Sequence, residues 1–117
     1  MMQLGTIAMW THGQLSGGDA QIGSVEVSGV VIDTRKLKPG DLFVAIKGER
    51  ADGHDYLAAA AARGAVAALV TRKVDSELPQ ILVNDAELAL GDLASAVRAQ
   101  RDVRVVGITG SNGKTTV

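Results

Sequence analysis

Residues 42–70 read LFVAIKGERADGHDYLAAAAARGAVAALV, and this stretch decides the fold. Leu42–Ile46 is an apolar run of strand length, followed by a polar loop that contains two glycines. The alanine-rich segment at about Tyr56–Arg63 predicts a helix, and Gly64 directly after it is typical of a C-cap. Ala65–Val70 then predicts a second buried strand. A strand, a helix and a strand in succession indicate an α/β fold with a partly parallel sheet.

The sequence before this stretch predicts one helix and several short strands. Gln21–Asp33 is rich in β-branched residues, which favour a pleated surface, so we expect short strands there. Lys38–Asp41 is a turn signal. Near the N-terminus, five residues are spaced as one side of a short helix: Leu4, Ile7, Ala8, Thr11 and Leu15.

The sequence after it predicts a strand, a helix and a final strand. Ile81–Val83 is the strand, and Asn84 or Asp85 can cap the helix that follows. Val103–Ile108 is a last apolar run, and we expect a small mixed sheet with flanking helices overall. Arg101–Asp102 breaks the helix, so we divide the chain into residues 1–101 and 102–117. The apolar stripe of the predicted helix consists of Leu90, Leu93, Ala94 and Val97.

Composition excludes several classes of function. The chain has 117 residues, enough for one core, and its aromatic content of 3% means that aliphatic side chains must build that core. Twelve Lys and Arg against thirteen Asp and Glu leave no basic surplus for a nucleic-acid partner. Without Cys there is no disulfide or thiolate site. Apolar runs are far shorter than the roughly 20 residues that cross a bilayer, so we expect no membrane insertion and a cytoplasmic protein. A monomer is expected as well, although nothing in the composition decides the oligomeric state.

The last residues of the chain form a candidate phosphate-binding loop. Gly110 and Gly113 permit the tight turn that exposes backbone N–H groups to an anion. Lys114 would reach the β- and γ-phosphates, and the Thr115 hydroxyl would bind Mg²⁺. Ile108 stands where the commonest pattern has glycine, so a glycine-rich connector with a solvated lysine is the alternative.

A second group of polar residues follows two predicted strands. Asp33, Thr34 and Arg35 end one strand, and the polar loop Lys47–Asp55 ends the next. Ligands favour such loop clusters in α/β sheets, which makes a binding crevice one interpretation. In the other, Asp33 forms a turn and the basic residues Arg35, Lys36 and Lys38 are a solvated surface.

Taken together, these motifs resemble the ATP-dependent Mur ligases of peptidoglycan synthesis. The motifs are DTRK at 33–36, PGDLFVA at 39–45, KGER at 47–50, DGHD at 52–55 and TGSNGKTT at 109–116. Within that family the chain is most similar to ligases that join D-alanyl-D-alanine to UDP-N-acetylmuramoyl-tripeptide. The ligases that add the third amino acid share the Asp-Ser/Thr-Arg and Pro-Gly-Asp-Leu-Phe features and remain the close alternative.

The resemblance implies a three-domain enzyme that activates a carboxylate as an acyl phosphate. This chain would be the N-terminal domain, which binds the uridine nucleotide, followed by the first strand and P-loop of a truncated central ATPase domain. ATP and Mg²⁺ are the implied cofactors. By itself the chain is expected to ligate nothing, since an isolated phosphate loop lacks its helix and its water-excluding partners.

The resemblance also assigns roles to individual residues. Lys114 would be catalytic, and Thr115 would be the metal ligand. Contacts with UDP fall on Ile32, Thr34, Glu49, Arg50 and Ala51. Contacts with ATP fall on Gly110, Ser111, Asn112, Gly113, Lys114, Thr115 and Thr116.

Three residues are left out of the site, and two other classes of function stay open. His12 and His54 are interpreted as structural or exposed, and Trp10 as a packing residue on the first helix. A generic P-loop NTPase would explain the terminal loop but not residues 33–55. A non-catalytic α/β binding module would leave both motifs without a ligand.

Overall fold

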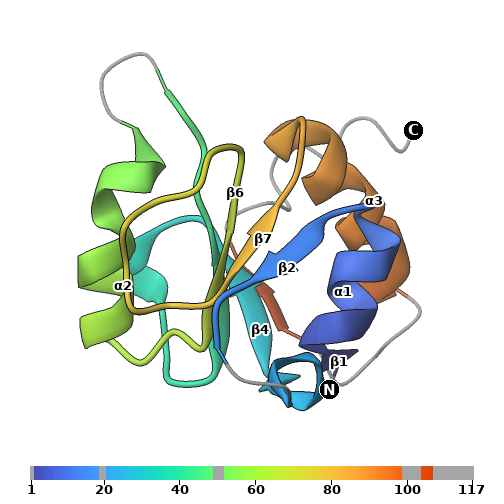
Figure 1. The fold of residues 1–117 in the computed structure, drawn as a ribbon, viewed down its shortest axis with the longest axis horizontal. Helices are drawn as coiled ribbons and strands as arrows, with labels where there is room; N and C mark the ends of the chain where they lie inside the picture. Colours follow the sequence, from blue (N-terminus) through green and yellow to red (C-terminus); the bar gives the residue numbers. More distant parts are fainter. Residues whose placement is uncertain (1, 19–20, 49–51, 99–103, 107–117) are drawn as a thin grey trace.

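The computed structural model describes residues 2–18, 21–48, 52–98 and 104–106, and it has the α/β fold that the sequence predicts (Figure 1). The elements in chain order are β1 (Met2–Gln3), α1 (Leu4–Trp10), β2 (Gln14–Ser16), η1 (Ile22–Ser24), β3 (Glu26–Val27), β4 (Gly29–Val31), η2 (Thr34–Lys36), β5 (Asp41–Val44), η3 (Gly53–Tyr56), α2 (Leu57–Ala62), β6 (Ala67–Val70), β7 (Gln80–Leu82), α3 (Ala86–Arg98) and β8 (Arg104–Val106), where η marks a 3₁₀ helix.

A six-stranded sheet forms the centre of the molecule, in the order β2-β7-β6-β5-β4-β8. Strands β4 to β8 pair in parallel with their neighbours, whereas β2 runs antiparallel to β7 at one edge. β1 and β3 form a separate two-stranded antiparallel ladder. The predicted small mixed sheet with flanking helices is therefore confirmed. Because the parallel strands end at the same edge, the loops that follow them lie near one another.

The sheet is buried on both faces. Figure 1 shows α1 and α3 on one side of it and α2 on the other. Side chains of β5 and of Ala45, the residue after it, alternate between the two faces: Leu42 and Val44 join the core under α1 and α3, and Phe43 and Ala45 join the core under α2. A strand covered on both faces is apolar along most of its length, which is why residues 42–46 form a continuous apolar run in the sequence.

The prediction that Leu15 lies on the first helix was wrong. Helix α1 ends at Trp10, and Leu15 lies in β2 opposite Ile81 of β7. At Gly13 the chain passes so close to β7 that an added Cβ would lie 2.4 Å from Ile81 Cγ2, a contact that only glycine avoids. Trp10 is half-buried and packs against the core, as the sequence predicted.

Two helices follow the sequence closely. Helix α2 is preceded by η3, and Gly64 directly after its C-cap has φ +101°, a conformation that favours glycine. Asp85 caps α3: its Oδ1 accepts hydrogen bonds from the N–H groups of Glu87 (2.9 Å) and Leu88 (3.0 Å). In contrast, Ile22 was expected in a strand and lies in η1.

Strand β8 takes the edge position beside β4, with Val106 opposite Val31. The predicted boundary at Arg101–Asp102 lies outside the described residues, so the division into residues 1–101 and 102–117 stays a prediction. No helix among the described residues is long and apolar enough to cross a membrane.

Candidate functional site

A pocket of about 560 Å³ opens beyond the C-terminal ends of β4 and β5. From β4 the chain proceeds outward through β5, β6 and β7, and β8 then returns to the other side of β4. Ligands bind in α/β sheets at such a reversal of strand order. The lining residues are Ile32, Asp33, Thr34, Arg35, Phe43, Ile46, Gly48, Gly53 and Tyr56.

The two predicted nucleotide contacts that the structure describes, Ile32 and Thr34, both line this pocket and are partly exposed. The other three, Glu49, Arg50 and Ala51, lie outside the described residues. Gly48, directly before them, and Gly53, two positions after Ala51, lie on the pocket wall.

Asp33 and Arg35 form a rigid polar corner of the pocket. Asp33 Oδ1 accepts from the Arg35 backbone N–H (2.9 Å) and Nε (3.1 Å), and Oδ2 accepts from Nη2 (2.8 Å). The side-chain hydrogen bonds from Arg35, followed by the backbone one, lower the pKa of the Asp33 carboxyl from 3.8 to about 2. Asp33 is thus the turn-former that the sequence allowed. Arg35 nevertheless presents an exposed guanidinium beside the pocket, a group that can bind an anion.

Three apolar side chains complete the pocket, and the sequence analysis did not select them. Phe43 is buried, Ile46 is half-buried, and Tyr56 keeps 45% of its surface exposed. An exposed ring beside a half-buried apolar wall can stack on a planar ligand. The signal was the single Tyr that follows DGHD, but nothing in the sequence placed it in the same pocket as Thr34.

The loop after β5 returns tightly to the sheet. Lys47 pairs with Asp52 in an antiparallel bridge, and the Gly53 N–H donates to the Ile46 carbonyl oxygen (2.9 Å). A Cβ at Gly53 would lie 2.7 Å from the Ile46 nitrogen and 3.0 Å from Ala45 Cα. Only glycine allows this approach, which brings both ends of the loop to the pocket.

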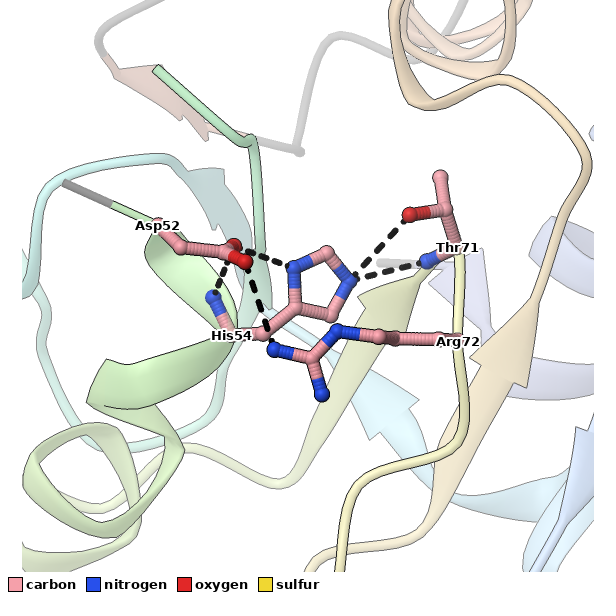
Figure 2. A network of polar contacts seen from close by, with 4 residues as sticks. All are labelled: Asp52, His54, Thr71 and Arg72. Atoms are coloured by element: carbon pink, nitrogen blue, oxygen red, sulfur yellow. Dashed lines mark hydrogen bonds and ion pairs between the residues drawn. The ribbon is translucent and has the colours of Figure 1, made fainter. Parts of the chain in front are cut away.

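A polar network joins Asp52 and His54 to the two residues that follow β6, Thr71 and Arg72 (Figure 2). Asp52 Oδ1 accepts a hydrogen bond from the backbone N–H of His54 (3.0 Å) and lies 2.6 Å from Nδ1 of the His54 ring. Arg72 Nη2 lies 3.2 Å from the other oxygen, Oδ2. On the other side of the ring, the Thr71 N–H donates to Nε2 (3.0 Å). The bonds from His54, first from its backbone and then from its ring, hold the pKa of the Asp52 carboxyl well below its usual range.

The residues predicted to bind ATP and Mg²⁺, Gly110 to Thr116, lie outside the described residues. Within the described ranges, no group of three or more His, Asp or Glu side chains is arranged to hold a metal ion. The pocket at β4 and β5 is thus the part of the predicted site that can be compared with the structure.

Comparisons with known proteins cover most of the chain. The family model described as "Mur ligase family, catalytic domain" matches residues 26–98. A UDP-N-acetylmuramoyl-tripeptide–D-alanyl-D-alanine ligase of Escherichia coli is 52% identical over 91% of this chain and 22% of its own length. A UDP-N-acetylmuramoyl-L-alanyl-D-glutamate–2,6-diaminopimelate ligase of Bacillus licheniformis is 42% identical over 78% of this chain and 19% of its own.

Solved structures agree with these matches. A MurF structure from Acinetobacter baumannii superposes with a TM-score of 0.73 at 35% identity, over 85% of this chain and 21% of that one. The MurF ligase of Thermotoga maritima, crystallised in complex with ADP, gives a TM-score of 0.54 at 34% identity over 65% of this chain and 17% of that one. The chain therefore spans about a fifth of the length of the proteins that it matches.

Proposed function

The chain belongs to the Mur ligase family, and from this membership we propose that its pocket at the C-terminal ends of β4 and β5 holds the uridine nucleotide of a UDP-linked muramoyl peptide. The protein to which it contributes would join D-alanyl-D-alanine to UDP-N-acetylmuramoyl-tripeptide in the cytoplasm, for peptidoglycan synthesis. The observation that carries the proposal is the meeting of Ile32, Thr34 and the two ends of the Lys47–Asp52 loop around one pocket.

The pocket has the size and chemistry for a nucleotide. Its volume of about 560 Å³ falls in the range of roughly 300–1,000 Å³ usual for small-molecule sites. The Thr34 hydroxyl and nearby backbone groups are suited to the polar edge of uracil, and the Tyr56 ring to its face. Arg35 on the wall, together with Arg50 in the loop, would attract the diphosphate. Glu49 and Ala51 remain predicted contacts.

The ligation step itself would depend on residues beyond this pocket. ATP with Mg²⁺ would supply the phosphoryl group that activates the carboxylate of the UDP-linked peptide. Backbone N–H groups of Gly110 to Thr116 would surround the phosphates, with Lys114 offsetting charge and Thr115 binding the metal. A relative crystallised with ADP supports an adenine nucleotide as cofactor.

The matched relatives favour the dipeptide-adding reaction. The D-alanyl-D-alanine ligase of E. coli exceeds the diaminopimelate ligase of B. licheniformis in both identity and share of this chain covered. Addition of the third amino acid is the second candidate, because its ligases match at 42% identity. A generic P-loop NTPase would not account for a family match that spans residues 26–98, ahead of the phosphate loop.

A titration with UDP tests the pocket. We expect uridine-selective amide chemical-shift changes at Thr34, Arg35 and Tyr56, with ADP as the nucleotide control. Thr34→Val and Tyr56→Leu should each weaken UDP binding about fivefold or more. Tyr56→Phe, which keeps the ring, and Thr6→Val on α1, which makes the same change as Thr34→Val, should have little effect. Equal responses to UDP and ADP, or shifts confined to other parts of the sheet, would contradict the proposal.

A further inference from the structure

We infer that His54 is a positioning residue: its neutral imidazole, with the proton on Nδ1, ties the Lys47–Asp52 loop to the end of β6 and so holds the wall of the pocket in its binding geometry. This inference rests on the proposed function for its consequence, but its structural part is independent of any ligand.

The hydrogen bonds allow one arrangement of protons on the ring. The Thr71 backbone N–H can only donate, and it points at Nε2 from 3.0 Å, so Nε2 must accept. The ring proton therefore lies on Nδ1 and is donated to Asp52 Oδ1 at 2.6 Å. The Thr71 hydroxyl, 3.3 Å from Nε2, is also placed to donate to it. A charged imidazolium would turn Nε2 into a donor facing another donor.

The ring is a link between two segments distant in the sequence. Thr71 directly follows β6, which ends at Val70, whereas Asp52 is the N-cap of η3 and the closing residue of the loop. Figure 2 shows the ring between them. His54 is 3% exposed, so water does not compete strongly for its two hydrogen bonds. Arg72 adds a second tie to Asp52, but its side chain is 57% exposed and screened by solvent.

His54 acts on the pocket through its neighbours. It is not a lining residue, whereas Gly53 on one side of it and Tyr56 two residues later both are. His54 holds the carboxylate of Asp52, and Asp52 directly follows Ala51, a proposed UDP contact. Without the ring, the Asp52 carboxylate would keep the bond from the His54 backbone N–H, and only the exposed Arg72 would still join it to the segment after β6.

Two substitutions divide the link into its halves. In His54→Asn the side-chain amide can still donate to Asp52, and in His54→Gln the side-chain oxygen can still accept from Thr71. If the link is needed whole, both variants should bind UDP about tenfold more weakly while they still unfold cooperatively. His12→Gln is the matched control, because His12 is exposed and lies beyond the end of α1. UDP affinities within twofold of wild type in the folded His54 variants would overturn the inference.

Two measurements on the unchanged chain serve in case the variants do not fold. Imidazole ¹⁵N shifts should identify His54 as the tautomer protonated on Nδ1, and the other tautomer would overturn the inference. Since coupling is reciprocal, saturation with UDP should slow hydrogen exchange at the Thr71 and His54 amides, and unchanged exchange at both would also overturn it. Failure of the wild-type chain to bind UDP would instead overturn the proposed function, and the tautomer result would still stand.

Discussion

At the scale of single residues, Asp33 combines two roles that the sequence allowed as alternatives, forming a turn and lining a binding pocket. It caps the turn that begins at Thr34, and it holds Arg35 by a two-oxygen ion pair on the pocket wall. Local structure therefore accounts for this motif, and the Arg35 guanidinium still lies beside the proposed diphosphate site. Asp33, Thr34 and Arg35 thus form a turn of the chain and also line the pocket.

This ion pair predicts a specific acid response. The pKa of Asp33 is lowered from 3.8 to about 2, so the unfolded chain takes up this proton first as pH falls. The stability that the pair contributes is complete above about pH 4 and is lost as pH falls through 2. Because the Arg35 side chain is 84% exposed, solvent screens the pair, and we expect its contribution to the free energy of unfolding to be small.

Urea unfolding at several pH values checks this expectation. In Asp33→Asn, which can still cap the turn, the loss of stability between pH 4 and pH 2 should be smaller than in wild type. Asp92→Asn, at an exposed position on α3, should leave the wild-type acid response unchanged. The expectation fails if Asp33→Asn and wild type lose stability in parallel over this pH range.

At the scale of elements, local signals predicted the central part of the fold and long-range contacts decided the rest. The run at residues 42–46, Gly64 and Asp85 each carry their information within a few positions, and the structure confirms all three. Leu15 fits a helical stripe as well as a strand, and only its pairing with Ile81, far along the chain, settles the matter. The same holds for the candidate pocket: Thr34 was selected as a predicted contact from its motif, whereas Tyr56 joins the pocket only after β5 and η3 are folded.

Two glycines in or beside helices should respond oppositely to alanine. At Gly64, φ is +101° and a Cβ would lie 2.8 Å from Pro39 Cα, so Gly64→Ala should destabilise the fold by about 1–3 kcal/mol. Gly91 lies inside α3 with nothing within 4 Å of its would-be Cβ, so Gly91→Ala should stabilise it by about 0.5–1 kcal/mol. Chemical denaturation of both variants measures the difference. Equal signs for the two changes would show that the backbone at Gly64 relaxes freely.

At the scale of the whole molecule, one sheet connects two cores. Leu93 of α3 belongs to the core on one face and Leu57 of α2 to the core on the other, and alternate residues of β5 enter both. A substitution that loosens the packing on one face should therefore also destabilise the other, because both cores share the backbone of β5. We expect a single cooperative unit rather than two layers that unfold in turn.

Leucine truncations on the two faces test this cooperativity. Leu57→Ala and Leu93→Ala should each cost about 2–5 kcal/mol, because both side chains are fully buried. The fluorescence of Trp10, on the side of α1, and the far-UV circular dichroism of the whole chain should melt together in wild type and in both variants. Separate transitions for the two signals in Leu57→Ala would mean that the faces unfold independently.

The bridge between Lys47 and Asp52 has a practical consequence for anyone who wishes to redesign this protein. It leaves four positions, 48–51, between two anchored ends. Because the backbone of Lys47 and Asp52 is paired, we expect an exchange of side chains between them to leave β5 unchanged. Asp52 and Gly53 must stay in any such exchange, since Asp52 forms the bridge and Gly53 allows the close approach to Ile46.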